Sequence, residues 1–184
     1  YLYIDIVMLG FLRPGVEVGH YVASTRILTI GLVAASILRT AVSPVLTRLE
    51  SSPVERSEVG SHHARIVTAF GGLAAVGGFV LAPEILEIVF GPQFREAAGT
   101  LRILMFSLMF MNIVEVYHTQ LVAWRMQTQQ MWIMIAGALF NVALNLALIP
   151  RYGMEGAALA TLASTFLILI LRSEEHTSEL QSRE

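Results

Sequence analysis

The chain has 184 residues, of which 55% are hydrophobic and only 14% charged, and its formal net charge is -2. Soluble domains carry about 25% charged residues, so this composition favours a membrane protein. It contains no Cys, which excludes disulfides, thiolate metal sites and a Cys nucleophile. It has no basic stripe of the kind that binds nucleic acid and no nucleotide-binding or catalytic motif. We therefore expect neither an enzyme nor a cofactor, a bound metal or a nucleic-acid partner.

Six apolar runs follow one another along the chain, over residues 1–12, 19–46, 65–82, 101–124, 131–150 and 156–171. About 20 mostly apolar residues in a helix cross a bilayer. The first run begins inside an apolar stretch and the last meets a polar tail, so we expect both to be truncated. An amphipathic stretch covers residues 84–90, and the longest polar connection, residues 47–64, is expected to be a loop in water. The sequence thus predicts an all-α, polytopic bundle of about six transmembrane helices.

Residues 172–184 break abruptly from the apolar run before them and resemble an in-frame translation of a sequencing-adapter oligonucleotide. We interpret them as an artefact that follows a truncated gene, with a genuine polar tail as the alternative. The domain that carries the function is therefore expected to be residues 1–171.

Small and polar residues mark the predicted contacts between helices. Rows of small residues let helix backbones approach closely in lipid, where no hydrophobic effect drives association. Asparagines one turn apart are predicted to hydrogen-bond between helices rather than to bind a ligand. The residues concerned are Gly72, Gly78, Asn141, Asn145, Gly156 and Ala160.

Ionisable residues within the runs are the candidate functional residues, because charge in lipid is costly. Asp5 and Arg26 flank the turn at residues 13–15 at similar predicted depths, so we expect them to approach each other or to face a common cavity. Alternatively, Arg26 snorkels to the interface and Asp5 pairs elsewhere. Arg26 is the candidate substrate ligand, since a guanidinium binds phosphate oxygens in bidentate fashion.

Glu115 and His118 lie close together in the fourth run and are candidates for coupling transport to a proton or another cation. A hydrogen-bonded seam between helices is the favoured interpretation of the same residues. Arg39 lies too far along its run to share a site with Arg26 and is expected to snorkel toward the cytoplasmic interface, with a role in the cavity as the alternative.

Three segments, residues 5–27, 81–104 and 141–164, follow one another at a family-specific spacing, and NVALNLALIPRYGMEGAALATLAS is the most specific of them. The chain resembles the second half of an oligosaccharide flippase, a Wzx-like polysaccharide transporter of the multidrug/oligosaccharidyl-lipid/polysaccharide exporter superfamily. The resemblance covers nearly all of residues 1–171.

The resemblance implies two six-helix lobes around a cavity that opens to each side of the membrane in turn. This chain would supply most of the second lobe and would need the missing N-terminal lobe as its partner, with residues 47–64 in the cytoplasm. The intact protein would flip a polyprenyl-diphosphate-linked oligosaccharide across the bacterial cytoplasmic (inner) membrane. A drug/cation antiporter of the same superfamily and an integral-membrane enzyme or structural subunit are the alternatives.

Overall fold

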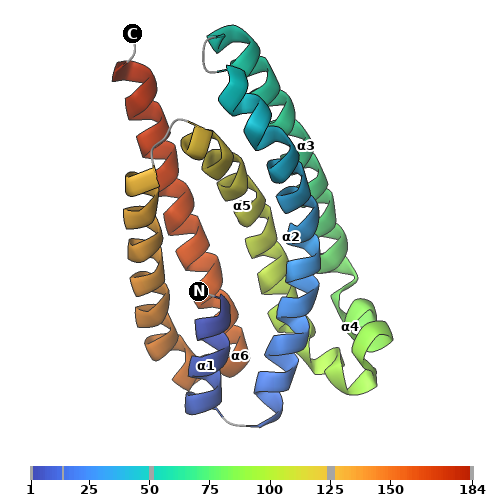
Figure 1. Cartoon of the computed structure of the whole chain (residues 1–184). Coiled ribbons are helices and arrows are strands. Elements are labelled where there is room, and N and C mark those ends of the chain that lie inside the picture. Colours follow the sequence, from blue (N-terminus) through green and yellow to red (C-terminus); the bar gives the residue numbers. More distant parts are fainter. Residues whose placement is uncertain (1, 14, 50–51, 124–126, 183–184) are drawn as a thin grey trace.

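The computed structural model describes residues 2–13, 15–49, 52–123 and 127–182, and these residues form helices joined by short connections (Figure 1). The prediction of an all-α, polytopic bundle is confirmed. In chain order the elements are α1 (Leu2–Leu12), α2 (Val16–Arg48), α3 (Pro53–Val80), α4 (Ala82–Phe90), the 3-10 helix η2 (Pro92–Ala97), α5 (Ala98–Ala123) and α6 (Gln127–Ser182).

Within the described residues, four helical segments are long and apolar enough to cross a membrane: Val16–Arg48, Glu58–Val80, Pro92–Tyr117 and Thr128–Glu174. The last is two antiparallel helices, because α6 reverses at Gly153, whose φ of 56° and ψ of -133° are not helical (Figure 1). Glycine adopts a positive φ without the steric strain that a Cβ introduces. The predicted fifth and sixth runs are therefore the first half of α6, before Gly153, and its second half, after Gly153.

The polar connection predicted over residues 47–64 is largely helical. α2 continues to Arg48, and α3 begins at Pro53, with a proline in its first turn where the missing N–H is not needed. The prediction of a loop was wrong for residues 53–64. The physical reason is that a helix already nucleated by its apolar part gains a hydrogen bond for each added residue without a new nucleation cost.

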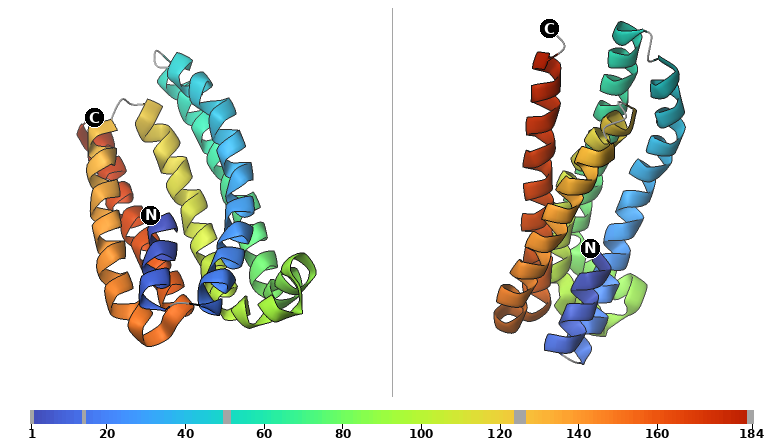
Figure 2. Two further views of the ribbon diagram at one scale, coloured as in Figure 1. Left: turned by 60° about the horizontal axis from the view of Figure 1, so that its bottom comes forward. Right: turned by 60° about the vertical axis from the view of Figure 1, so that its left-hand side comes forward.

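α5 lies at the centre of the bundle (Figures 1 and 2). It packs against α2 and α3 on one side and α6 on the other, whereas α1 packs mainly against α6. Leu9, Leu28 and Leu104 bring α1, α2 and α5 into one buried core. The end that carries Arg13, Gly153 and α4 is named the turn end here, and α2 and α3 meet at the opposite end (Figure 1).

Glycines set the closest approach of α3 to α5. A Cβ added at Gly78 would overlap the side chain of Met105, and one added at Gly71 would overlap Asn112. Gly72 has open space around its Cβ position, so the close contact predicted there falls one residue earlier. The reason is helical phase, because Gly71 and Gly78 are seven residues apart and share a face, while Gly72 is rotated by about 100°.

Gly156 lies against the other half of α6. A Cβ at this position would lie 2.5 Å from the backbone oxygen of Leu148, so the first and second halves of α6 meet closely beside their turn. Ala160, one turn further along the second half, is fully buried.

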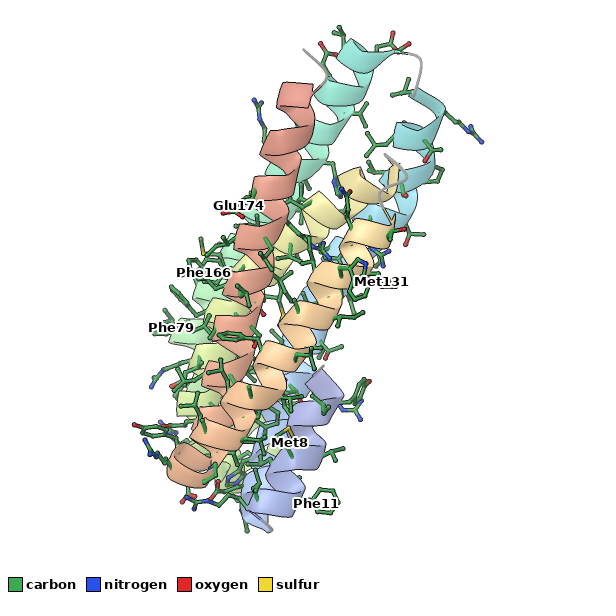
Figure 3. The ribbon with its side chains drawn as sticks, turned by 90° about the vertical axis from the view of Figure 1, so that its left-hand side faces the viewer. Met8, Phe11, Phe79, Met131, Phe166 and Glu174 are labelled. Carbon is green, nitrogen blue, oxygen red and sulfur yellow. The ribbon has the colours of Figure 1, made fainter. Side chains whose placement is uncertain are left out.

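Large apolar side chains cover the outside of the bundle. Phe11, Phe79 and Phe166 point outward (Figure 3) and are 85%, 45% and 48% exposed. Apolar surface of this extent on a protein in water would mark an interaction site. In lipid the same side chains meet a solvent as apolar as themselves.

α6 continues through the range interpreted as an artefact, as far as Ser182. Arg172, the first residue of that range, is 1% exposed, and its Nη1 donates to the backbone oxygen of Val114 at 2.9 Å. Arg172 thus packs against α5. The foreign origin of residues 172–184 stays a prediction.

Candidate functional site

A buried carboxylate forms the centre of the candidate site. Asp5 on α1 is 0% exposed and accepts hydrogen bonds from α2 and from both halves of α6. The Nδ2 atom of Asn145 donates to Oδ1 at 2.5 Å, and Thr161 Oγ1 donates to Oδ2 at 2.6 Å. The Tyr21 hydroxyl donates to the same Oδ2 at 3.1 Å. Residues separated by up to 156 positions therefore meet at one carboxylate.

Asn141 extends this cluster by one helical turn. Its Oδ1 accepts a hydrogen bond from Asn145 Nδ2 at 3.0 Å, and both asparagines are fully buried. The Oδ1 of Asn145 is a buried acceptor that receives no hydrogen bond from the part of the chain that the structure describes. The site thus gathers carboxylate, hydroxyl and amide oxygens, which are the ligands that hard cations prefer.

No basic side chain pairs with Asp5 among the residues that the structure describes. Their ion pairs join Arg13 to Glu17, Arg39 to Glu115 and Arg95 to Glu87. A buried carboxylate is costly unless its charge is neutralised or compensated. Hydroxyl and amide donors supply part of that compensation. The arrangement therefore suits reversible binding of a proton or a monovalent cation.

Arg26 does not approach this carboxylate. It is exposed on α2, and Tyr21, five residues earlier and about 140° around the helix, faces Asp5 instead. The predicted direct pair is not formed, because α2 begins at Val16 rather than at Gly19. Counted from the turn, Arg26 consequently lies almost one helical turn deeper than Asp5. That Arg26 faces a cavity stays a prediction.

Glu115 on α5 contacts Arg39 on α2, with Nε 3.1 Å from Oε2. Arg39 was expected to snorkel, and the structure places it in an interhelical ion pair instead. The two side chains are 37% and 32% exposed. The side chain of His118 lies outside the described residues. A coupling role for Glu115 and His118 stays a prediction.

Glu17 forms a second polar cluster at the turn end. One of its carboxylate oxygens accepts the backbone N–H of Met154 at 3.0 Å, where the second half of α6 begins. Arg13 lies 3.7 Å from Glu17 and donates to the backbone oxygen of Pro150 at 2.9 Å. A negative charge at a helix N-terminus is stabilising, so Glu17 and Arg13 fasten the start of α2 to the turn of α6.

Tyr21, Thr161 and Glu17 were not identified from the sequence. In the sequence Tyr21 and Thr161 are indistinguishable from other helix residues, because no neighbouring residue indicates that they contact a buried carboxylate. The small-residue row of the sixth run, which includes Gly156 and Ala160, was the available signal for a close approach near Thr161.

No family model and no solved structure matches the chain. "Probable flippase AglR" of Haloferax volcanii is 28% identical over 177 residues, which are 93% of this chain and 37% of the relative. "Probable low-salt glycan biosynthesis flippase Agl15" of the same organism is 25% identical over 176 residues, 94% of this chain and 37% of the relative.

An uncharacterized membrane protein of Methanocaldococcus jannaschii is 32% identical over 88 residues, 48% of this chain and 17% of that protein. The chain spans little more than a third of the length of the two flippases that it matches. It is a multi-pass membrane protein related to the flippases over nearly its whole length, and the family resemblance drawn from its sequence is confirmed.

Proposed function

We propose that this chain is part of a transporter that flips a lipid-linked oligosaccharide across the cytoplasmic membrane by alternating access. Its similarity along 93% and 94% of its length to two proteins named as flippases supports the proposal. Because the chain spans 37% of each relative, the activity belongs to the longer protein. The bacterial membrane stays a prediction, since these relatives are archaeal.

The observation that carries the mechanism is the buried carboxylate of Asp5, held by Tyr21, Asn145 and Thr161. We infer that Asp5 is the coupling site for a proton or a monovalent cation. An ion drives a conformational cycle only if it binds the alternating states with different affinity. A site built from α1, α2 and both halves of α6 meets this condition, because any relative movement of these helices changes its geometry.

Arg26 is the proposed ligand for the diphosphate of the substrate. It begins a strip on α2 that continues with Thr29, Ser36 and Thr40, all exposed or half-buried. The exposed apolar side chains of Val33 and Ile37 lie on the same face. Each hydroxyl donates to a carbonyl oxygen of the preceding turn, at 2.8, 2.7 and 2.9 Å respectively. These local hydrogen bonds use the hydroxyl protons but leave the hydroxyl groups on the surface of the helix. A strip that contains an arginine is better suited to a water-filled cavity than to lipid.

The proposal is tested by glycan export in cells that depend on the intact protein. Arg26→Ala is expected to abolish export and to leave membrane insertion unchanged. Asp5→Asn is expected to abolish it as well. Arg95→Ala, which removes an exposed arginine paired with Glu87 at the turn end, is the matched control and should export normally. Normal export by the Arg26→Ala variant would remove this residue from the mechanism.

A drug/cation antiporter is the second candidate, favoured by the acidic site at Asp5 and opposed by the exposed Arg26 on α2. The two functions are separated by deleting the gene of the intact protein. If the protein is a flippase, its deletion traps lipid-linked oligosaccharide on the cytoplasmic leaflet. If it is an antiporter, its deletion leaves glycan export intact and makes the cells more sensitive to cationic drugs.

A further inference from the structure

We propose that the turn end carries a binding site for the sugar residues of the lipid-linked oligosaccharide, separate from the diphosphate ligand Arg26. This inference rests on the proposed function and adds a site for the part of the substrate that an arginine alone does not hold. Three observations carry it: a groove lined by charged and aromatic side chains, polar groups in it that pair with no other described residue, and its alignment with Arg26 on α2.

Two hollows lie at the turn end, where the start of α2 contacts both η2 and α6 (Figure 2). The first has a volume of about 410 Å³ and extends to the turn of α6, and the second has a volume of about 460 Å³ and lies between α2 and η2. Val16, His20 and Glu96 line both hollows, which are therefore parts of one groove, named the turn-end groove here. Volumes of this size are typical of pockets for small-molecule ligands.

The lining of the turn-end groove combines charges of both signs. Its carboxylates belong to Glu17, Glu96 and Glu155, and its guanidinium groups belong to Arg13 and Arg151. A sugar hydroxyl both donates and accepts hydrogen bonds. Carboxylates that accept and guanidinium groups that donate can therefore bind neighbouring hydroxyls of one sugar ring.

Aromatic rings supply the apolar contacts of the groove. Tyr152 is 57% exposed and lines the first hollow. Phe94 lines the second, where its ring lies edge-on to that of His20 with the ring centres 5.3 Å apart. The face of an aromatic ring is negative, so it attracts the weakly positive C–H groups on the face of a sugar ring.

His20 is a buried polar group that the groove leaves open to a ligand. It is 5% exposed and lines both hollows, and its imidazole forms no hydrogen bond with the part of the chain that the structure describes. A polar group that is buried without a hydrogen-bond partner is costly. A sugar hydroxyl in the groove would supply a partner for this ring.

The charges of the groove select a neutral ligand. Glu96, Arg151 and Glu155 are exposed and form no ion pair or hydrogen bond with other described residues, whereas Arg13 and Glu17 pair with each other. Three carboxylates oppose an anionic ligand such as a second phosphate. No three histidine or carboxylate groups of the described residues are grouped so that they could hold a metal ion. A neutral ligand rich in hydroxyls therefore fits the lining best.

The groove is aligned with Arg26 along α2. Gly19 lines the second hollow and lies seven residues before Arg26, which is about 10.5 Å along the helix axis and only about 20° around it. Both residues are exposed. In a diphosphate-linked oligosaccharide the sugars are attached to the diphosphate. A diphosphate bound at Arg26 therefore leaves its sugars free to extend along this face of α2 into the turn-end groove.

The test uses the purified intact protein in nanodiscs and two probes. One probe is the lipid-linked oligosaccharide extracted from cells in which export is blocked, and the other is undecaprenyl diphosphate, which has no sugar. Tyr152→Ala and Glu96→Gln are each expected to raise the Kd of the sugar-bearing probe about 10-fold, as the loss of one aromatic contact or one charge-assisted hydrogen bond would. Neither variant should change the Kd of undecaprenyl diphosphate.

The matched controls are Glu84→Gln and Trp132→Ala. They remove an exposed carboxylate of α4 and an aromatic ring that is 62% exposed, and neither residue lines the groove. Both variants should keep the wild-type Kd for each probe.

An unchanged Kd of the sugar-bearing probe in Tyr152→Ala and Glu96→Gln would overturn the inference. An equal rise for both probes would overturn it as well, because the substitutions would then act on the diphosphate site or on the whole protein. If Tyr152→Ala fails to fold, Arg151→Ala at the neighbouring exposed position gives the same decision. The export assay with Arg26→Ala judges the flippase function separately, so failure of the sugar site leaves that result standing.

Discussion

Replacing Thr161 with Val probes the hydrogen bonding of the buried carboxylate at nearly constant shape. Thr161 and Asp5 are both 0% exposed, and the Thr161 hydroxyl donates to Oδ2 at 2.6 Å. Val fills almost the same volume, so the change removes a donor and creates no cavity. The carboxylate keeps its bonds from Tyr21 and Asn145. The measured effect should therefore reflect chiefly this charge-assisted hydrogen bond, together with the longer contact of Thr161 Oγ1 with the Tyr21 hydroxyl at 3.4 Å.

The expected size follows from the setting of that bond. Hydrogen bonds to charged groups contribute about 1.5–3 kcal/mol in water-soluble proteins. Interhelical hydrogen bonds in membranes contribute less, about 0.6 kcal/mol on average and up to about 1.7. A short bond to a carboxylate belongs near the upper end of the membrane range, so we expect Thr161→Val to destabilise the intact protein by about 1–2 kcal/mol.

The measurement is unfolding of the intact protein in mixed micelles, monitored by circular dichroism. Ser164→Ala is the matched control, because Ser164 is equally buried on the same helix and donates only to the backbone oxygen of Ala160, at 2.7 Å. A double-mutant cycle of Thr161→Val with Asp5→Asn isolates the pair. Destabilisation no greater than that of Ser164→Ala, with a coupling energy below about 0.5 kcal/mol, would refute the site described here.

Two further changes test the packing and the ion pair. Gly78→Val should destabilise the bundle by about 1–3 kcal/mol in the same unfolding assay, because its side chain would overlap Met105, whereas Gly72→Val should be nearly neutral; equal losses would contradict the assigned helix phase. Arg39→Ala should lower the midpoint of unfolding more than the double variant Arg39→Ala/Glu115→Ala, since the single change leaves Glu115 without its arginine and the double change removes both partners. If the double variant is less stable than Arg39→Ala, the pair does not act as described.

The transmembrane spans can be predicted from the sequence because a bilayer permits very few backbone conformations. An apolar run of sufficient length has to satisfy its backbone hydrogen bonds internally, so residues 131–150 and 156–171 could be assigned to helices without knowing their neighbours. Helix ends are harder to predict. Residues 53–64 are polar enough for a loop, yet they extend α3, because propagation of an existing helix does not depend on hydrophobicity.

Individual site residues could be identified, but their partners could not. A carboxylate in an apolar run is unusual by itself, and this was sufficient to select Asp5 from composition and position. The same argument selected Arg26, but the predicted contact between them required the depth of each residue. The start of α2 was predicted three residues too late, so the predicted depth of Arg26 was wrong. In the structure Tyr21 faces the carboxylate instead.

By itself the sequence determined that this protein is an all-helical membrane protein related to the flippases, and which of its intramembrane charges are unusual. Only the tertiary structure decided that Asp5 is surrounded by Tyr21, Asn145 and Thr161, and that Arg39 pairs with Glu115. The reason is that helix formation depends on neighbouring residues and on lipid, whereas side-chain contacts depend on the rotation, depth and crossing of helices far apart in the chain.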